Sequence, residues 1–115
     1  VIWHQGDLRN TEDVERLVKG MDIIIQAAAT TSGSKDIVNR PYIHVTDNAV
    51  MNSLLLRAAY DHNVSNFVFF SCTVMYNSSE RALKECDFNA GQELHPRYQG
   101  VGWTKVYVEK MCDFF

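Results

Sequence analysis

The sequence predicts an α/β fold, a truncated and doubly wound parallel sheet of about three strands with flanking helices, in one unit over residues 1–115. Apolar stretches of strand length alternate with longer helical patterns, which indicates βαβ units. The strand-like run "DIIIQAAA" is continuously apolar, as in a strand that is buried on both faces of a parallel sheet. The pattern opens on a strand and stops inside an apolar helix. We therefore expect a piece of a larger fold, cut at both ends.

The first elements are short. The apolar stretch at residues 1–8, "VIWHQGDL", predicts a strand. Polar residues then lead through Thr11 to two acidic residues, a pattern that suits the positive end of a helix. Val14, Leu17 and Val18 give this helix one apolar face, and Gly20 is placed to end it.

The middle of the chain is predicted to be strand, loop and helix. Residues 21–29 are rich in isoleucine and have the length of a buried strand. Residues 30–41 are small and polar, with Gly33 and Pro41 among them, so we expect a loop. Residues 42–62 repeat apolar side chains at helical spacing, which predicts a long helix with a broad apolar face.

The last part repeats the alternation. Residues 66–76 are β-branched and aromatic and predict a third strand. Residues 77–98 are polar and indicate an irregular loop, long enough to suggest a functional role. A final helix is expected to start near Gly102 and to run to the end of the sequence.

Composition narrows the class of protein. With 46% hydrophobic residues in 115, the chain can form a core, and a net charge of −3 argues against nucleic acid or an anionic membrane as a partner. The apolar runs are shorter than a membrane span. Three cysteines at irregular spacing indicate reduced thiols and a cytoplasmic location, with no metal site. The three are Cys72, Cys86 and Cys112.

Four motifs in order carry a resemblance to a known family. They are "MDIIIQAAATTSG", "VTDNAVMNSLLLRAA", "NFVFFSCTVMY" and the helix "GWTKVYVEK". The set resembles the extended short-chain dehydrogenase/reductase family, which contains NAD-dependent epimerases and dehydratases of nucleotide sugars, and looks most like its GDP-fucose synthase branch. The resemblance implies a partial Rossmann-like domain, NAD or NADP as cofactor, and hydride transfer at a carbon of a nucleotide sugar.

The lysine helix is where the resemblance is incomplete. In the family, a tyrosine shuttles the proton of the reacting hydroxyl, and a lysine one turn later holds the cofactor ribose and lowers the tyrosine's pKa. Lys105 matches the lysine, but Val101 stands at the tyrosine's position and cannot transfer a proton. Seven residues of regular helix separate Tyr98 from Lys105 by about 10 Å. Gly100 and Gly102 disfavour an uninterrupted helix, and a bend there could bring Tyr98 to Lys105 as a substitute acid.

A second departure lies at the end of the third predicted strand. The family's catalytic hydroxyl falls on Cys72, whose thiol is a poorer hydrogen-bond donor. Either Thr73 takes that role, or the role is weakened and Cys72 is an ordinary buried cysteine.

The resemblance also implies cofactor contacts. Its adenine-contacting pair matches Asp7 and Leu8, and an asparagine that orients the site matches Asn48, whereas Gln26 stands where the family usually has histidine. The full set of implied cofactor-binding residues is Asp7, Leu8, Ala28, Ala29, Thr30, Asn48, Ser71 and Lys105. None of the six glycines forms the family's phosphate-binding loop, and the C-terminal sugar-binding segment is also absent. We therefore expect the 115-residue chain to bind NAD(P) weakly or not at all.

Three functions remain open at this point. The chain is a piece of an NAD(P)-dependent nucleotide-sugar enzyme, a cofactor-binding relative without catalysis, or an oligomerisation module. Wide apolar helix faces also predict a homodimer or larger assembly. The residues expected at or near that contact are Leu54, Leu55, Val108 and Met111.

Overall fold

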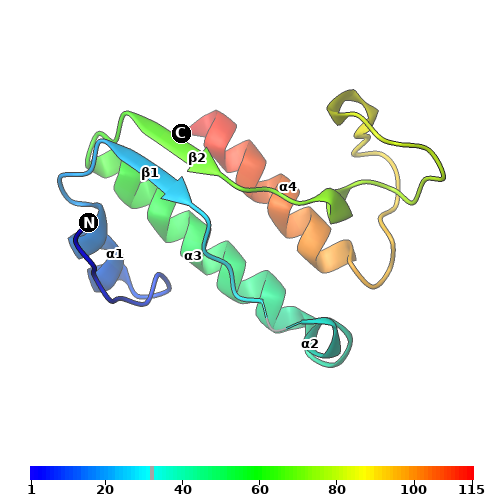
Figure 1. Ribbon diagram of the computed structural model, residues 1–115, viewed down its shortest axis with the longest axis horizontal. Coiled ribbons are helices and arrows are strands. Elements are labelled where there is room, and N and C mark those ends of the chain that lie inside the picture. The colour runs from blue at the N-terminus through cyan, green and yellow to red at the C-terminus, as the bar shows by residue number, and fades with distance from the viewer. Residues whose placement is uncertain (32) are drawn as a thin grey trace.

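The computed structural model describes residues 1–31 and 33–115, and its elements alternate as an α/β fold (Figure 1). The helices and strands are α1 (Thr11–Val18), β1 (Ile23–Gln26), α2 (Ser34–Asn39), α3 (Pro41–Asp61), β2 (Asn66–Phe69) and α4 (Gln99–Phe114), with short 3₁₀ turns η1 (Thr73–Met75) and η2 (Glu85–Asp87). β1 and β2 pair in parallel, with Ile23 opposite Asn66 and Gln26 opposite Phe69. The predicted fold class is confirmed.

The described part of the sheet has two strands, and the prediction of about three was wrong in one place. Residues 1–7 form no strand, and the side chains of Val1, Ile2 and Trp3 are exposed. An apolar stretch shows that a segment can pair, but a ladder also needs a neighbouring strand within reach.

Two other boundaries differ from the prediction. The expected loop at 30–41 contains the helix α2, which the small polar residues did not indicate. The expected strand at 66–76 ends at Phe69, and the chain then turns through η1. The long segment at 77–98 is irregular apart from η2 and a turn at residues 96–98 just before α4, as predicted.

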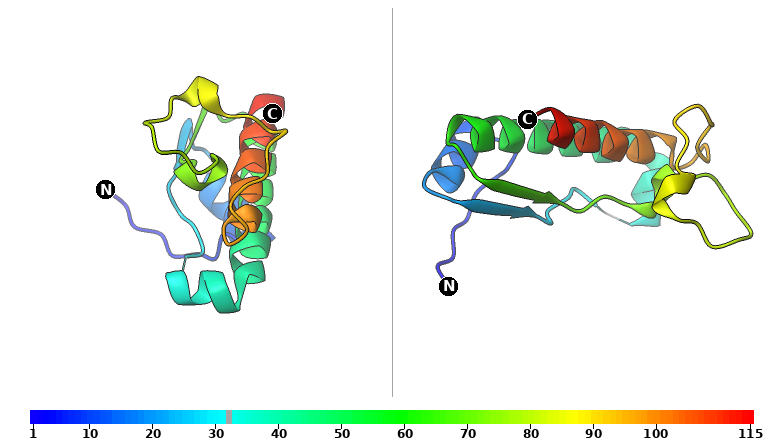
Figure 2. Two further views of the ribbon diagram at one scale, coloured as in Figure 1. Left: turned by 90° about the vertical axis from the view of Figure 1, so that its right-hand side faces the viewer. Right: turned by 90° about the horizontal axis from the view of Figure 1, so that it is seen from above.

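The helices lie on one face of the sheet. α3 and α4 run side by side behind the strands, and α1 packs beside α3 (Figures 1 and 2). The buried core cluster lies between α1, α3 and the sheet, and Ile24 and Phe67 pack against it. Its members are Val14, Val18, Met51, Leu55 and Ala58.

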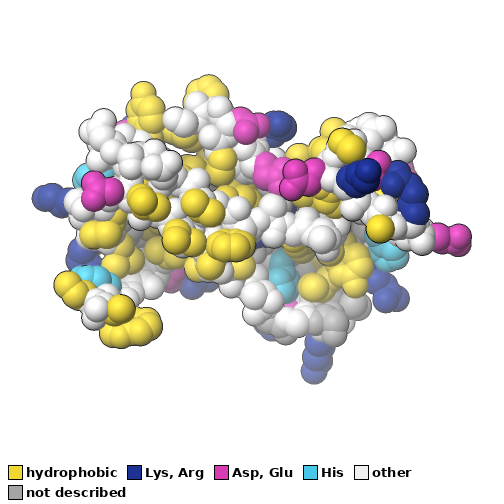
Figure 3. Space-filling view, turned by 45° about the horizontal axis from the view of Figure 1, so that its top comes forward, with side chains coloured by type: hydrophobic (Ala, Val, Ile, Leu, Met, Phe, Trp, Pro, Cys, Tyr) yellow, Lys and Arg dark blue, Asp and Glu magenta, His cyan; other side chains and the backbone are white. Residues whose placement is uncertain are grey.

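The other face of the sheet is bare. Ile23 and Ile25 from β1 and Val68 from β2 are 45–66% exposed, as is Phe70 just after the strand. A band of hydrophobic side chains crosses the middle of the face seen in Figure 3. None of the helices in the described residues is both long enough and apolar enough to cross a membrane.

Two glycines let α4 approach its neighbours closely. A Cβ at Gly100 would lie 2.7 Å from Val45 Cγ2 on α3, and one at Gly102 would lie 2.6 Å from Leu94 Cδ1 and 3.0 Å from the Val74 carbonyl oxygen. α4 is a continuous helix from Gln99 onward, so the predicted start near Gly102 was late. The glycines serve close packing and do not interrupt the helix.

The residues expected at a subunit contact are partly unavailable for one. Leu55 and Val108 are 5% and 1% exposed, and they pack inside the chain. Leu54 and Met111 are half-buried. The large apolar side chains that α3 and α4 do expose are Tyr42, Val50, Tyr60, Tyr107 and Phe114.

Candidate functional site

The parallel pairing of β1 and β2 places the ends of both strands at one edge of the sheet. We call residues 27–30 and 70–73 at this end the carboxyl edge. Ligands of α/β sheets bind outside the carboxyl ends of the strands, because loops and helix termini converge there. The sequence-predicted cofactor residues from Ala28 to Thr30, and Ser71 with its neighbours, all lie at this edge.

Lys105 reaches the carboxyl edge from α4. Its Nζ donates a hydrogen bond of 2.7 Å to the Phe70 carbonyl oxygen and lies 4.4 Å from the centre of the Phe69 ring. Burial lowers the pKa of Lys105, and the charges of Cys72 and Glu109 oppose part of this effect. An ammonium has three donors, and the Phe70 bond uses one of them. The amine is therefore held at the end of β2 with donors left for a ligand.

The residues after β2 offer a hydroxyl on each side of a thiol. Ser71 is exposed and its Oγ lies 3.5 Å from Met75 Sδ, whereas Cys72 is half-buried. Thr73 is exposed and begins η1. A hollow of about 370 Å³ opens here. It is lined by Ser71, Cys72, Met75, Tyr76, Glu85, Phe88 and Glu109.

The structure does not bring Tyr98 to Lys105. Tyr98 precedes the first residue of α4, its carbonyl accepts a 2.8 Å bond from the Gly102 N–H, and its ring packs against His95 at 5.4 Å. Because α4 continues through both glycines, Tyr98 and Lys105 stay about 10 Å apart along the helix axis. The bend that would have made Tyr98 a substitute acid is absent.

A network of three buried amides holds the chain that follows β1. Asn48 accepts a 2.9 Å bond from the Thr30 N–H and donates to the carbonyls of Thr30 and His44 at 3.0 and 2.6 Å. Gln26 donates to Asn52 at 3.0 Å and accepts a 3.0 Å bond from the Ala28 N–H. We refer to Gln26, Asn48 and Asn52 as the amide network.

Sequence reasoning found only one member of this network. Asn48 was expected at the site, Gln26 was noted only as a departure from the family, and Asn52 was missed. A signal was present, because Asn48 and Asn52 are four residues apart on an apolar helix and so share a face. Glu109 was also missed, although it follows Lys105 by one turn and lines the hollow beside Cys72.

Asp7 is held in a turn before α1. Its carboxylate accepts bonds of 3.0 and 2.9 Å from the Arg9 side chain, and these bonds lower the pKa of Asp7 to about 2. Arg9 also donates a 2.8 Å bond to Asp47 on α3, whose carboxylate lies 3.4 Å from Thr30 Oγ1. The turn that carries Asp7 and Leu8 is thus joined to the chain at the carboxyl edge.

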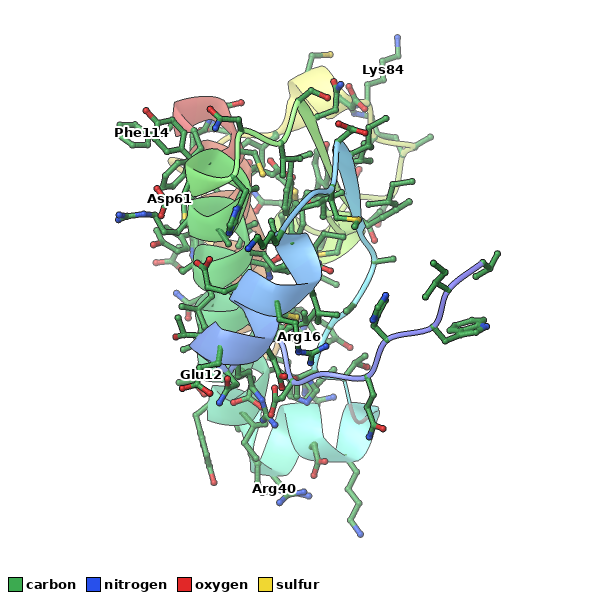
Figure 4. The ribbon with its side chains drawn as sticks, turned by 90° about the vertical axis from the view of Figure 1, so that its left-hand side faces the viewer. Glu12, Arg16, Arg40, Asp61, Lys84 and Phe114 are labelled. Carbon is green, nitrogen blue, oxygen red and sulfur yellow. The ribbon has the colours of Figure 1, made fainter. Side chains whose placement is uncertain are left out.

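Further bonds hold this turn from the side of α1. The Asp7 N–H donates to Asp13 at 2.9 Å. Arg16 bonds Asp13 and the Gln5 carbonyl, and Figure 4 shows its side chain extending from α1 toward the N-terminal segment.

These residues fit a dinucleotide. Residues 27–29 are all alanine and all exposed, so the backbone after β1 is open to close approach by a flat or extended ligand. Leu8 and Ala28 both line an apolar hollow of about 300 Å³ along β1. The cofactor residues expected from the sequence thus come from five places in the chain, and those after β1, those after β2 and Lys105 on α4 meet at the carboxyl edge.

The parallel pairing of β1 and β2 and the helices on one face of them form part of a Rossmann-like α/β domain. The sequence profile of the NAD dependent epimerase/dehydratase family matches residues 1–114, and the chain belongs to that family. An uncharacterized UDP-glucose epimerase, YtcB from Bacillus subtilis (strain 168), is 27% identical over 105 residues, which are 91% of this chain and 31% of that protein.

Solved structures share the fold at low identity. A GDP-D-glycero-L-gluco-heptose synthase from Campylobacter jejuni, determined in the presence of NADPH, superposes with a TM-score of 0.83 at 21% identity. A GDP-mannoheptose C4 reductase from the same organism, with NADP bound, gives 0.83 at 20% identity. Each comparison covers 94% of this chain and 32% of the other. The chain thus spans about a third of the length of these relatives.

Proposed function

We propose that the chain is the central part of an NAD(P)-dependent enzyme that moves a hydride to or from a carbon of a nucleotide sugar, as an epimerase, dehydratase or reductase. The observation that carries the proposal is Lys105. Its ammonium is held over the end of β2 beside Ser71, Cys72 and Thr73, at the edge where the backbone after β1 is open. Family membership supports the same class of reaction.

Each residue has a role in this proposal. The cofactor, when bound, supplies the hydride chemistry. Lys105 donates its remaining N–H groups to hydroxyls of the cofactor ribose, and Asp7 accepts from the adenine amine while Leu8 packs against the ring. Residues 28–30 and Ser71 border the cofactor, and Thr73 donates a hydrogen bond to the reacting sugar hydroxyl.

Val101 occupies the position of the family's proton-transferring tyrosine. Val101 holds no proton, and Tyr98 lies about 10 Å from Lys105 along α4. The hydroxyl of Thr73 and the thiol of Cys72 lie at the end of β2, near the amine that would stabilise an anion. Val101 and Cys72 together favour a second candidate function, a relative that binds the cofactor without catalysis.

The 115-residue unit is proposed to be incomplete for binding. The phosphate-binding glycine loop is not part of this sequence, and helix N-terminal amides supply much of the affinity for a pyrophosphate. We also propose that the protein forms a homodimer or larger assembly. The contact would use the apolar side chains that α3 and α4 expose, including Val50, Tyr60 and Tyr107.

The proposal is tested by fluorescence titration, with NADH and NADPH, of the longer enzyme in which the proposal places this chain, referred to below as the intact protein. We expect binding, with affinity about tenfold weaker in Lys105→Met because charge-assisted hydrogen bonds are lost. Lys110→Met is the matched control, since Lys110 is exposed and bonds Asp113 on the same helix. Absence of binding by the wild type contradicts the proposal. Binding without turnover of any nucleotide sugar in a panel selects the second candidate.

A further inference from the structure

We propose that Gln26 and Asn52 are positioning residues for the cofactor, which act by setting the place of residues 27–30. This inference rests on the proposed function, because it concerns how the chain after β1 meets a bound dinucleotide. Neither side chain is expected to touch the cofactor. Both are buried in the chain, with Gln26 4% and Asn52 2% exposed.

The two amides form one directed chain of bonds from α3 to the backbone after β1. Asn52 Nδ2 donates a 2.7 Å bond to the Asn48 carbonyl, which fixes the orientation of the Asn52 amide. Its Oδ1 then accepts the 3.0 Å bond from Gln26 Nε2. The Gln26 amide is thereby oriented with Oε1 toward the Ala28 N–H, from which it accepts at 3.0 Å.

Asn48 binds the same backbone segment at Thr30, two residues after Ala28. It bonds both the N–H and the carbonyl of Thr30, at 2.9 and 3.0 Å. The backbone is thus held by side-chain amides at Ala28 and again at Thr30, with Ala29 between them. β1 itself ends at Gln26, so α3 and not the sheet determines where this segment lies.

Stability alone does not explain the choice of residues. Buried amides have a desolvation cost that an apolar pair of similar volume avoids, so apolar side chains would fill this space well. What apolar side chains cannot do is bind a backbone N–H in a fixed direction. The bonds of this pair end on Ala28, and the side chains of Ala27 and Ala29 on either side of it are small and exposed. A displacement here changes how closely a ligand approaches the backbone.

The test uses Asn52→Leu in the intact protein, with NADH affinity and melting temperature both measured. We expect about tenfold weaker binding, because the Gln26 amide loses the partner that orients it. Val14→Ala is the matched control, since it removes core volume at a residue that is 1% exposed and lies outside the carboxyl edge. At a similar loss of melting temperature, Val14→Ala should leave the affinity for NADH unchanged.

Two further measurements separate positioning from general destabilisation. Amide hydrogen exchange at Ala28 should accelerate in Asn52→Leu while exchange in β2 stays as in the wild type. The double variant Gln26→Leu/Asn52→Leu should bind NADH no more weakly than the weaker single variant, because both residues act through one contact. If a single variant fails to fold, the affinity for NADH is measured on the double variant instead. Replacing both amides leaves neither of them buried without its partner.

The outcomes are distinguishable. If the wild type binds neither NADH nor NADPH, the proposed function fails. If the wild type binds and Asn52→Leu binds equally well, only the positioning role fails. Affinity losses that simply follow melting temperature, as in Val14→Ala, or that add in the double variant, also overturn the positioning role.

Discussion

The contact of β1 with α3 and the contact of β2 with α4 hold the same edge of the sheet by different means. The first uses three buried amides whose bonds end on the backbone at Ala28 and Thr30. The second uses one lysine ammonium on the Phe70 carbonyl, while the two glycines of α4 let that helix come close to α3, Leu94 and η1. Each amide of the first contact is oriented by its own hydrogen bonds, so this contact can hold the backbone after β1 in one place. The Lys105 ammonium of the second contact has N–H donors that the Phe70 carbonyl does not use, so it can bind a ligand.

The largest effect is expected at the amide network. Asn48→Leu removes three hydrogen bonds and leaves the Thr30 N–H and carbonyl without that partner, so we expect a loss of about 3 kcal/mol in the free energy of unfolding. Urea unfolding of the intact protein measures it. Ser53→Ala is the control, because the Ser53 hydroxyl bonds only within α3 and toward Met111, and its loss should be small. Equal losses of unfolding free energy in Asn48→Leu and Ser53→Ala would contradict a special contribution of the bonds between Asn48 and Thr30 to stability.

A smaller loss is expected where α4 packs. Gly102→Ala places a Cβ against Leu94 and the Val74 carbonyl, and this should cost about 1–2 kcal/mol net of the gain in helix propensity. The midpoint of urea unfolding is again the measurement. Gly91→Ala provides a comparison, since a Cβ there meets only Asn89 Oδ1, at 3.2 Å. A neutral Gly102→Ala would show that Leu94 yields easily and that the close approach is not required.

The smallest effect concerns the exposed turn before α1. The bonds from Arg9 depress the pKa of Asp7 to about 2 in the folded state, against an ordinary value of 3.8. A depressed carboxyl pKa stabilises the fold above the unfolded pKa, and that contribution is lost as the pH falls from about 4 through about 2. In Asp7→Asn the melting temperature should therefore change less over this window than in the wild type.

Salt provides a check on the same pair. Added salt should diminish the difference between the wild type and Arg9→Gln, because exposed ion pairs are screened. Arg57→Gln is the control, since it breaks another exposed pair, with Asp61, that lies within one helix. If the wild type and Asp7→Asn respond identically to acid, the Arg9 bonds do not stabilise the folded state.

Periodicity predicted the elements that bury a face. β1, α3, β2 and the later turns of α4 all follow from apolar spacing, because burial against the core imposes that spacing on the sequence. The apolar residues at 1–7 predicted a strand that does not form, because a strand also needs a neighbouring strand, which the sequence of one segment cannot reveal. α2 was missed because its short polar sequence matches a loop as well as a helix.

Some residues of the candidate site could be identified from the sequence, and contacts between distant segments could not. Lys105 was identified by the resemblance of its helix to the family's lysine helix, and its amine lies at the end of β2. The contact between Gln26 and Asn52 could not be found, because the two residues are 26 positions apart and their side chains come together only when β1 lies on α3. The two glycines at 100 and 102 predicted a bend because glycine disfavours regular helix. Their packing role could not be predicted, since local propensity says nothing about what lies against a helix.

The close approach at Gly100 and Gly102 also limits how this sequence can vary. A library of random substitutions at positions 100–102, selected for folded protein, should return glycine at both outer positions. Val101, between them, is half-buried. Selection for the folded protein should therefore retain the two glycines together, because each makes its own close contact from the same helix.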